Sequence, residues 1–195
     1  PKEIARARAI RPSGYPKCLL CKENVGFSGD AARAARQTHR IIPLALATGK
    51  YYLQYSPYVY YNEHCIVLNQ THRPMVVDES TFQNLFSFLD LFPHYMIGSN
   101  ADLPIVGGSI LSHDHYQGGR HIFPIQKAKV LYAFPLAQED TLVELVKWPL
   151  STIRLTSASK EALIRLSCRI LDCWRSYDAP AYNIFSHTGT TPHNT

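Results

Sequence analysis

The pattern of apolar and polar positions predicts strands in the first half of the chain. Residues 41–68 are rich in aromatic and β-branched side chains, which favour strands. Within this stretch we expect strands over 51–55 and 65–68, with a hairpin turn at Gly49-Lys50. A further strand is expected over about 109–118, where two glycines end it and allow the backbone to approach a ligand closely.

Two segments repeat apolar residues at helical spacing. The first runs from about residue 80 to 92 and carries an S-x-x-Q capping box that begins at Ser80. The second spans about 160–176, and Ser157 or Ser159 would cap it. Both apolar stripes are expected to pack against the core.

Composition excludes several classes of protein. The chain has 195 residues, of which 46% are hydrophobic and 18% are charged, so we expect a folded domain with a sizeable core. No stretch approaches the ~20 apolar residues of a membrane span. Residues 1–10 are expected to form a short charged helix and lack the apolar region of a signal peptide. Because the chain has no initiator Met and stops abruptly, we expect a fragment of a longer protein.

The net charge and the cysteines restrict the expected binding partners and the expected cellular compartment. The formal charge of +5 comes from scattered basic residues, which is not the footprint of a nucleic-acid surface. It suits a solvated basic surface or a small phosphorylated ligand. Five cysteines are an odd number, and only Cys18 and Cys21 are closely spaced. This argues for a reducing compartment and leaves the pair free to bind a metal ion.

The most informative segment is the run from His113 to Gly119, with the sequence HDHYQGG. Side chains alternate between the two faces of a strand, so His113, His115 and Gln117 are expected to share one face. Three aligned polar side chains are unusual for packing alone, which favours a functional site. Main-chain amides and a hydroxyl group are available to an anion just upstream, at Gly107, Gly108 and Ser109.

The cysteine pair predicts half of a metal site. Cys18 and Cys21 supply two thiolates, and a tetrahedral zinc site needs two further ligands. No second C-x-x-C pair exists, so the missing ligands are best sought among the histidines. His72, in a loop after a strand, and His113 would complete a Cys2His2 site. The alternatives are a redox pair, for which a thioredoxin-like context is absent, and two unpaired thiols.

The two histidines of the H-x-H pair leave two kinds of chemistry open. Both could bind one catalytic metal ion, as in metal-dependent hydrolases. Alternatively, His113 binds metal and His115 attacks phosphorus, so that a phosphoramidate divides one transfer into two displacements. Gln117 could then hydrogen-bond the phosphate oxygens. Because glutamine is no general acid at neutral pH, it weakly favours transfer to an acceptor over hydrolysis.

Several motifs together resemble one family. The H-x-H-x-Q strand resembles the histidine-triad superfamily, whose nucleotidyltransferase branch carries Gln in place of the last His. Longer stretches are similar to the bacterial second type of galactose-1-phosphate uridylyltransferase, namely 16–27, 54–65, 98–121, 187–189 and 192–195. The resemblance covers nearly the whole chain, whereas members of that family are considerably longer and are built from two related halves.

The resemblance implies a histidine-triad-like α+β fold, with a mostly antiparallel sheet, packed helices and an incomplete second repeat. We expect a catalytic half with the metal site over residues 1–135 and the start of a truncated second half over 136–195. The loop 98–108 would arch over the phosphates. The fragment is expected to be weakly active or inactive without the rest of the chain.

The resemblance also implies a reaction. UMP would move from UDP-glucose to galactose 1-phosphate through a uridylyl-histidine intermediate, in the Leloir pathway of galactose metabolism. By motif position, His115 is the nucleophile and Gln117 its phosphate-stabilising partner, while Ser109 and Asn100 contact the substrate. His64 precedes a strand beside the active strand and is a further candidate phosphate contact, although a hydrogen-bonded structural histidine is the favoured interpretation.

The resemblance further implies cofactor, partners and location. A structural zinc ion, as in the first type of the family, would be held by Cys18, Cys21, His72 and His113. The expected partners are UDP-glucose and galactose 1-phosphate, with no nucleic acid and no membrane; a homodimer is left open. Free thiols and the absence of an export signal point to the cytoplasm. A metal-dependent hydrolase and a non-catalytic, zinc-stapled nucleotide-binding fragment remain the alternatives.

Overall fold

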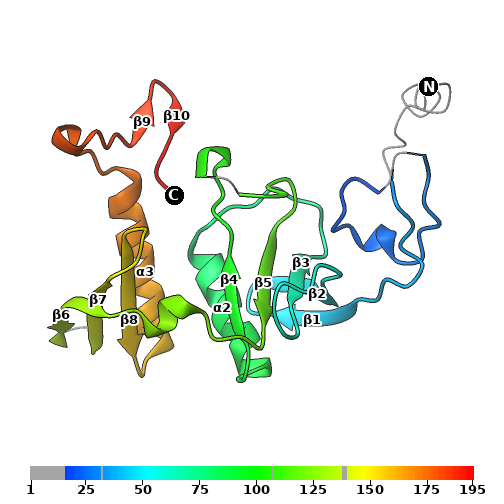
Figure 1. Cartoon of the computed structure of the whole chain (residues 1–195), viewed down its shortest axis with the longest axis horizontal. Helices are drawn as coiled ribbons and strands as arrows, with labels where there is room; N and C mark the ends of the chain where they lie inside the picture. Colours follow the sequence, from blue (N-terminus) through cyan, green and yellow to red (C-terminus); the bar gives the residue numbers. More distant parts are fainter. Residues whose placement is uncertain (1–15, 32, 107, 138–139) are drawn as a thin grey trace.

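The computed structural model describes residues 16–31, 33–106, 108–137 and 140–195. The helix expected over 1–10 and the candidate anion-binding Gly107 lie outside the described residues. The described residues form two larger antiparallel sheets, each packed against one helix, and a separate two-stranded hairpin (Figure 1). The two helices also contact each other. The α+β class and the antiparallel sheets predicted from the sequence are therefore confirmed.

The first sheet has five strands in the order β1-β2-β3-β5-β4. Its strands are β1 (Ile42–Leu46), β2 (Gly49–Tyr55), β3 (Cys65–Asn69), β4 (Met96–Ser99) and β5 (His115–Gly119). Its helix is α2 (Glu79–Leu91). The insertion of β5 between β3 and β4 gives the strand that carries His115 and Gln117 of the H-x-H-x-Q motif a paired strand on both sides.

The second sheet has three strands in the order β6-β7-β8, and helix α3 packs against β8. These elements are β6 (Val130–Leu136), β7 (Thr141–Val146), β8 (Thr152–Ser157) and α3 (Lys160–Arg175). A small hairpin of β9 (His187–Thr188) and β10 (Thr191–Pro192) follows. The second sheet begins at Val130, inside the catalytic half predicted over 1–135. The division of the chain into two halves after residue 135 stays a prediction.

The core lies between the first sheet and α2. Its buried members share the sheet face that points toward the helix, or lie on the helix itself: Leu46, Tyr51, Leu53, Cys65, Val67, Phe88 and Tyr116. Because side chains alternate along a strand, His115 and Gln117 point to the opposite face of β5 from Tyr116. Burial of one face thus directs the two candidate catalytic side chains away from the core.

The beginning of α2 differs from the prediction. Asp78 is the N-cap, and its carboxylate accepts a hydrogen bond from the main-chain N–H of Thr81 at 3.2 Å. The capping box expected at Ser80 and Gln83 is therefore wrong by two residues, because Asp78 is a strong N-cap and Ser80 instead donates to it. The predicted cap of α3 is confirmed at Ser159, whose hydroxyl accepts from the N–H of Ala162.

Two strand boundaries also differ. The β1–β2 turn is formed by Ala47 and Thr48, since Leu46 pairs with Gly49, so the turn predicted at Gly49-Lys50 is wrong by two residues. Asn84 of α2 holds this turn by accepting from the N–H and the hydroxyl of Thr48. The strand predicted over 109–118 begins only at His115, because the preceding residues form a turn with Ile110 at φ +53°.

Candidate functional site

The structure brings the four predicted metal ligands together. The sulfur atoms of Cys18 and Cys21 lie 3.6 Å apart. Nδ1 of His113 is 3.2 Å from the sulfur of Cys18, and Nδ1 of His72 is 3.2 Å from that of Cys21. All four ligand atoms lie within 4.8 Å of one another. Around a tetrahedral zinc ion, bonds of about 2.3 Å to sulfur and 2.0–2.1 Å to nitrogen place ligand atoms about 3.3–3.8 Å apart.

Neighbouring groups hold these ligands in a metal-binding orientation. Nε2 of His113 donates to the main-chain carbonyl of Asn69 at 2.9 Å, which leaves Nδ1 free to bind a cation. The buried Asn24 amide donates to the carbonyls of Cys18 and Cys21, each at 2.8 Å. Burial raises the pKa of the Cys18 thiol to about 11, and a bound cation would reverse that preference by stabilising the thiolate. The cluster therefore fits a metal ion.

His115 is buried and is not one of these four ligands. Its Nδ1 lies 2.7 Å from the main-chain carbonyl of His113, so Nδ1 carries the proton and donates. Nε2 consequently keeps its lone pair. Burial lowers the pKa of His115, which favours the neutral imidazole. A neutral imidazole with an oriented lone pair can act as a nucleophile or a base.

A chain of hydrogen bonds runs from His115 across the polar face of the sheet. The Asn100 side chain is 3.4 Å from Nε2 of His115 and accepts from the Gln117 amide at 3.2 Å. Gln117 in turn lies 3.2 Å from Nε2 of His64. Because His115 donates through Nδ1, Asn100 must donate to Nε2, Gln117 to Asn100, and His64 to Gln117. Hydrogen bonds therefore link the two predicted catalytic residues, His115 and Gln117, with two predicted substrate-binding residues, Asn100 and His64.

His64 occupies the buried end of this chain. Its ring lies between Tyr60 and Tyr61, with ring centroids 5.0 and 4.7 Å away. Nδ1 is buried and, among the described residues, has no hydrogen-bond partner. His64 is 3% exposed and hydrogen-bonds Gln117, so it supports that side chain, and its contact with a phosphate stays a prediction.

The glycines near the site are required by packing. A Cβ atom on Gly108 would lie 2.5 Å from the main-chain oxygen of Ala101, next to Asn100. On Gly118 it would lie 2.8 Å from the main-chain oxygen of Met96, and on Gly119 2.8 Å from that of Glu63. The expectation that the last two glycines admit a ligand is therefore wrong, because protein fills the space. Ser109 is exposed and is open to a ligand.

Comparison with known proteins adds independent evidence. Residues 1–74 match the sequence profile of a family described as galactose-1-phosphate uridyl transferase, N-terminal domain. Across its whole length the chain is 57% identical to a galactose-1-phosphate uridylyltransferase of Clostridium acetobutylicum and 54% identical to one of Butyrivibrio fibrisolvens. It spans 39% and 50% of the length of these relatives, respectively. No solved structure matches.

The motif strand, the Cys/His cluster and these relatives define the class: the chain is related to nucleotidyltransferases. Within that class its whole length is similar to galactose-1-phosphate uridylyltransferases, of which it spans half or less. The resemblance predicted from the motifs is confirmed by these matches. In the described part of the chain, no helix has the length and apolar character needed to cross a membrane.

Proposed function

We propose that this chain carries the uridylyl-transfer site of a UDP-glucose–hexose-1-phosphate uridylyltransferase, built on a histidine-triad-like fold. The orientation of His115 carries the proposal. Its Nδ1 proton is held by the His113 carbonyl, and its Nε2 lone pair points to the polar face of the sheet. The proposed substrates are UDP-glucose and galactose 1-phosphate, the substrates implied by the family.

In the first displacement, Nε2 of His115 attacks the phosphorus atom that carries uridine. The N–P bond forms while the P–O bond to glucose 1-phosphate breaks, and the leaving phosphate takes the electron pair. Positive charge develops on the imidazole ring, and the Nδ1–H bond to the His113 carbonyl stabilises it. The Asn100 amide, which donates to Nε2 in the free protein, becomes available to a phosphate oxygen.

In the second displacement, a phosphate oxygen of galactose 1-phosphate attacks the same phosphorus atom. The P–N bond breaks, UDP-galactose leaves, and His115 returns to its neutral form with Nδ1 still protonated. Gln117 donates to the phosphate in both steps but supplies no proton. Because the leaving group and the acceptor are both phosphates, neither step needs a general acid. Ser109 and the Gly108 main chain are the proposed further phosphate contacts.

The proposed zinc ion is structural and would be held by Cys18, Cys21, His72 and His113. When bound, it would neutralise the thiolates and fix the chain entering β5. The protein itself contributes to the geometry of this metal site, because the Asn69 carbonyl orients the His113 ring.

One observation opposes the alternative of a metal-dependent hydrolase with both histidines as ligands. Nδ1 of His115 is committed to a main-chain carbonyl and Nε2 faces Asn100, whereas His113 faces the cysteines. The two rings therefore serve different sites. The hydrolase and the non-catalytic nucleotide-binding fragment remain outcomes of the experiment below.

The deciding experiment is intact mass spectrometry after mixing with UDP-glucose, without an acid quench because phosphoramidates are acid-labile. We expect a gain of one uridylyl group that galactose 1-phosphate removes. His115→Ala should abolish the gain, whereas His94→Ala, at an exposed position, should keep it. Bound UDP-glucose without an adduct would support the non-catalytic fragment. Chelation-sensitive hydrolysis without an adduct would support the hydrolase.

A further inference from the structure

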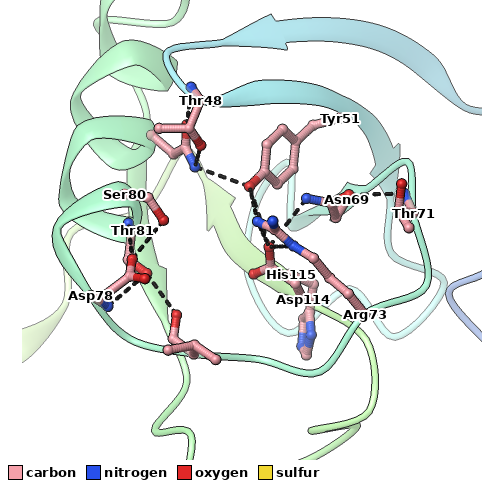
Figure 2. A network of polar contacts seen from close by, with 12 residues as sticks. Thr48, Tyr51, Asn69, Thr71, Arg73, Asp78, Ser80, Thr81, Asp114 and His115 are labelled. Atoms are coloured by element: carbon pink, nitrogen blue, oxygen red, sulfur yellow. Dashed lines mark hydrogen bonds and ion pairs between the residues drawn. The ribbon is translucent and has the colours of Figure 1, made fainter.

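The acidic residue between the two histidines is buried and heavily hydrogen-bonded. The Asp114 side chain is 6% exposed and lies beside the Arg73 guanidinium (Figure 2). Its Oδ2 atom accepts from Nη2 of Arg73 at 2.7 Å and from Nε at 3.1 Å. It also accepts from the Asn69 amide at 3.2 Å and from the Tyr51 hydroxyl at 3.3 Å. One carboxylate oxygen thus gathers four donors from three residues.

Main-chain hydrogen bonds join the same two segments. The N–H of Asp114 donates to the carbonyl of Arg73 at 2.8 Å, and the N–H of Asn69 donates to the carbonyl of Asp114 at 2.9 Å. Two of the three joined residues are next to histidines of the site. Arg73 follows His72, and Asp114 separates His113 from His115. The side-chain ion pair therefore links the segment that carries His72 to the segment that carries His113 and His115.

The clasp, meaning the Arg73–Asp114 pair, is anchored in the core. Nη2 of Arg73 also donates to the Tyr51 hydroxyl at 3.3 Å. Asn84 of α2, which is fully buried, donates to the Tyr51 hydroxyl at 3.0 Å and to that of Tyr116 at 3.2 Å. Only the Asp114 side of the pair is buried, so desolvation of the carboxylate offsets much of the attraction, whereas removal of Arg73 leaves a buried carboxylate without its cation. The network is therefore better suited to fixing the orientation of the Asp114 main chain than to adding stability.

We propose that Asp114, held by Arg73, is a positioning residue for the transfer site. Asp114 fixes the peptide that it shares with His113, and the carbonyl of that peptide holds the Nδ1 proton of His115. Without the carboxylate, this peptide keeps only its main-chain hydrogen bond to the Arg73 carbonyl, and the His113 carbonyl turns away from His115 more readily. His115 then exchanges into the tautomer that carries its proton on Nε2, which has no lone pair with which to attack phosphorus. The catalytic consequence rests on the proposed function; the effect on the tautomer does not.

The variants are chosen to separate positioning from stability. Asp114→Ala removes the acceptor and Arg73→Ala removes the main donor, while Arg73→Lys restores the charge with fewer donors. The Arg73 side chain is 49% exposed, so its variants test the proposal where Asp114→Ala fails to fold. Glu144→Ala is the matched control, because it removes a partly buried carboxylate paired with Arg154 in the second sheet.

The first measurement is the rate of adduct formation from UDP-glucose in the protein at its full natural length. We expect Asp114→Ala and Arg73→Ala to slow it by about tenfold to a hundredfold, as for a misplaced reacting group. UDP-glucose affinity and metal content should change little, and Arg73→Lys should recover part of the rate. Glu144→Ala should behave as the wild type. A wild-type rate in both alanine variants would overturn the proposal.

The second measurement is the tautomer of His115, read from two-bond ¹H–¹⁵N correlations of histidine rings and assigned with His115→Ala. We expect a protonated Nδ1 in the wild type and a mixture of tautomers in the clasp variants. An unchanged Nδ1–H signature in those variants would overturn the proposal. If the wild type forms no adduct, the proposed function fails, yet this spectrum still decides whether Asp114 positions the ring.

Discussion

Replacement of Cys18 by serine removes one ligand of the Cys/His cluster and tests whether a metal ion staples this fold. The cluster joins Cys18 to His113 across 95 positions in the sequence. In the chain-entropy description of a cross-link, closing a loop of that length stabilises the folded state by about 4.7 kcal/mol. That value is the upper limit of the loss, reached if the ion leaves, because Cys21 preserves most of the linkage if the ion stays.

The expected result is a melting temperature lower by up to about 9–19 °C when the ion is lost, since 1 kcal/mol corresponds to roughly 2–4 °C in a chain of this size. The assay is thermal unfolding combined with zinc content per chain by atomic emission. Cys173→Ser, at an exposed position of α3, is the control and should change neither quantity. A Cys18→Ser protein with wild-type melting and wild-type zinc content would refute the structural role of the metal.

Three further substitutions test other parts of the structure. Gln117→His should raise hydrolysis relative to transfer, because imidazole can move a proton to or from water; an unchanged ratio of UMP to UDP-galactose would contradict the role given to Gln117. Gly119→Ala should lower the free energy of unfolding by about 1–3 kcal/mol, because the new Cβ would meet main-chain oxygen at a φ of +154°, whereas Gly49→Ala has open space. Equal urea midpoints for these two variants would count against that packing. Asn84→Ala should cost about 2–3 kcal/mol in urea unfolding, since it removes the amide donor of the buried Tyr116 hydroxyl and one of the two donors of the Tyr51 hydroxyl. An effect as small as that of the exposed Asn62→Ala would show the network to be weak.

The helices were predictable because their signals are local. A 3.6-residue period and a serine cap located α3 nearly to the residue. The start of α2 was missed because Asp78 and Ser80 both suit an N-cap, and only the fold shows which N–H each side chain can reach. The β1–β2 turn was displaced because its position depends on pairing with α2 through Asn84, which lies far away in the sequence.

The metal-binding part of the candidate site was predictable because the number of ligands that zinc requires is known. Two thiolates require two more ligands, and that requirement led to His72 and His113. The Arg73–Asp114 clasp was missed because an acid between two histidines has no sequence signal for its partner. Its partner is set by the pairing of two loops 41 positions apart, which only tertiary structure specifies. The buried, hydrogen-bonded position of His64 agrees with the structural histidine expected there, although its partner Gln117 was not predicted.

The Cys/His cluster also bears on the order in which the protein is assembled during synthesis. Its first ligand leaves the ribosome long before its last, and the described residues between Pro16 and Arg40 contain only one short 3-10 helix, Lys22–Asn24. That segment has little secondary structure with which to hold itself in place before His113 is made. The metal would therefore fix this segment only late in synthesis. Its removal should expose residues 16–40 to proteases, while the five-stranded sheet persists because it has its own core.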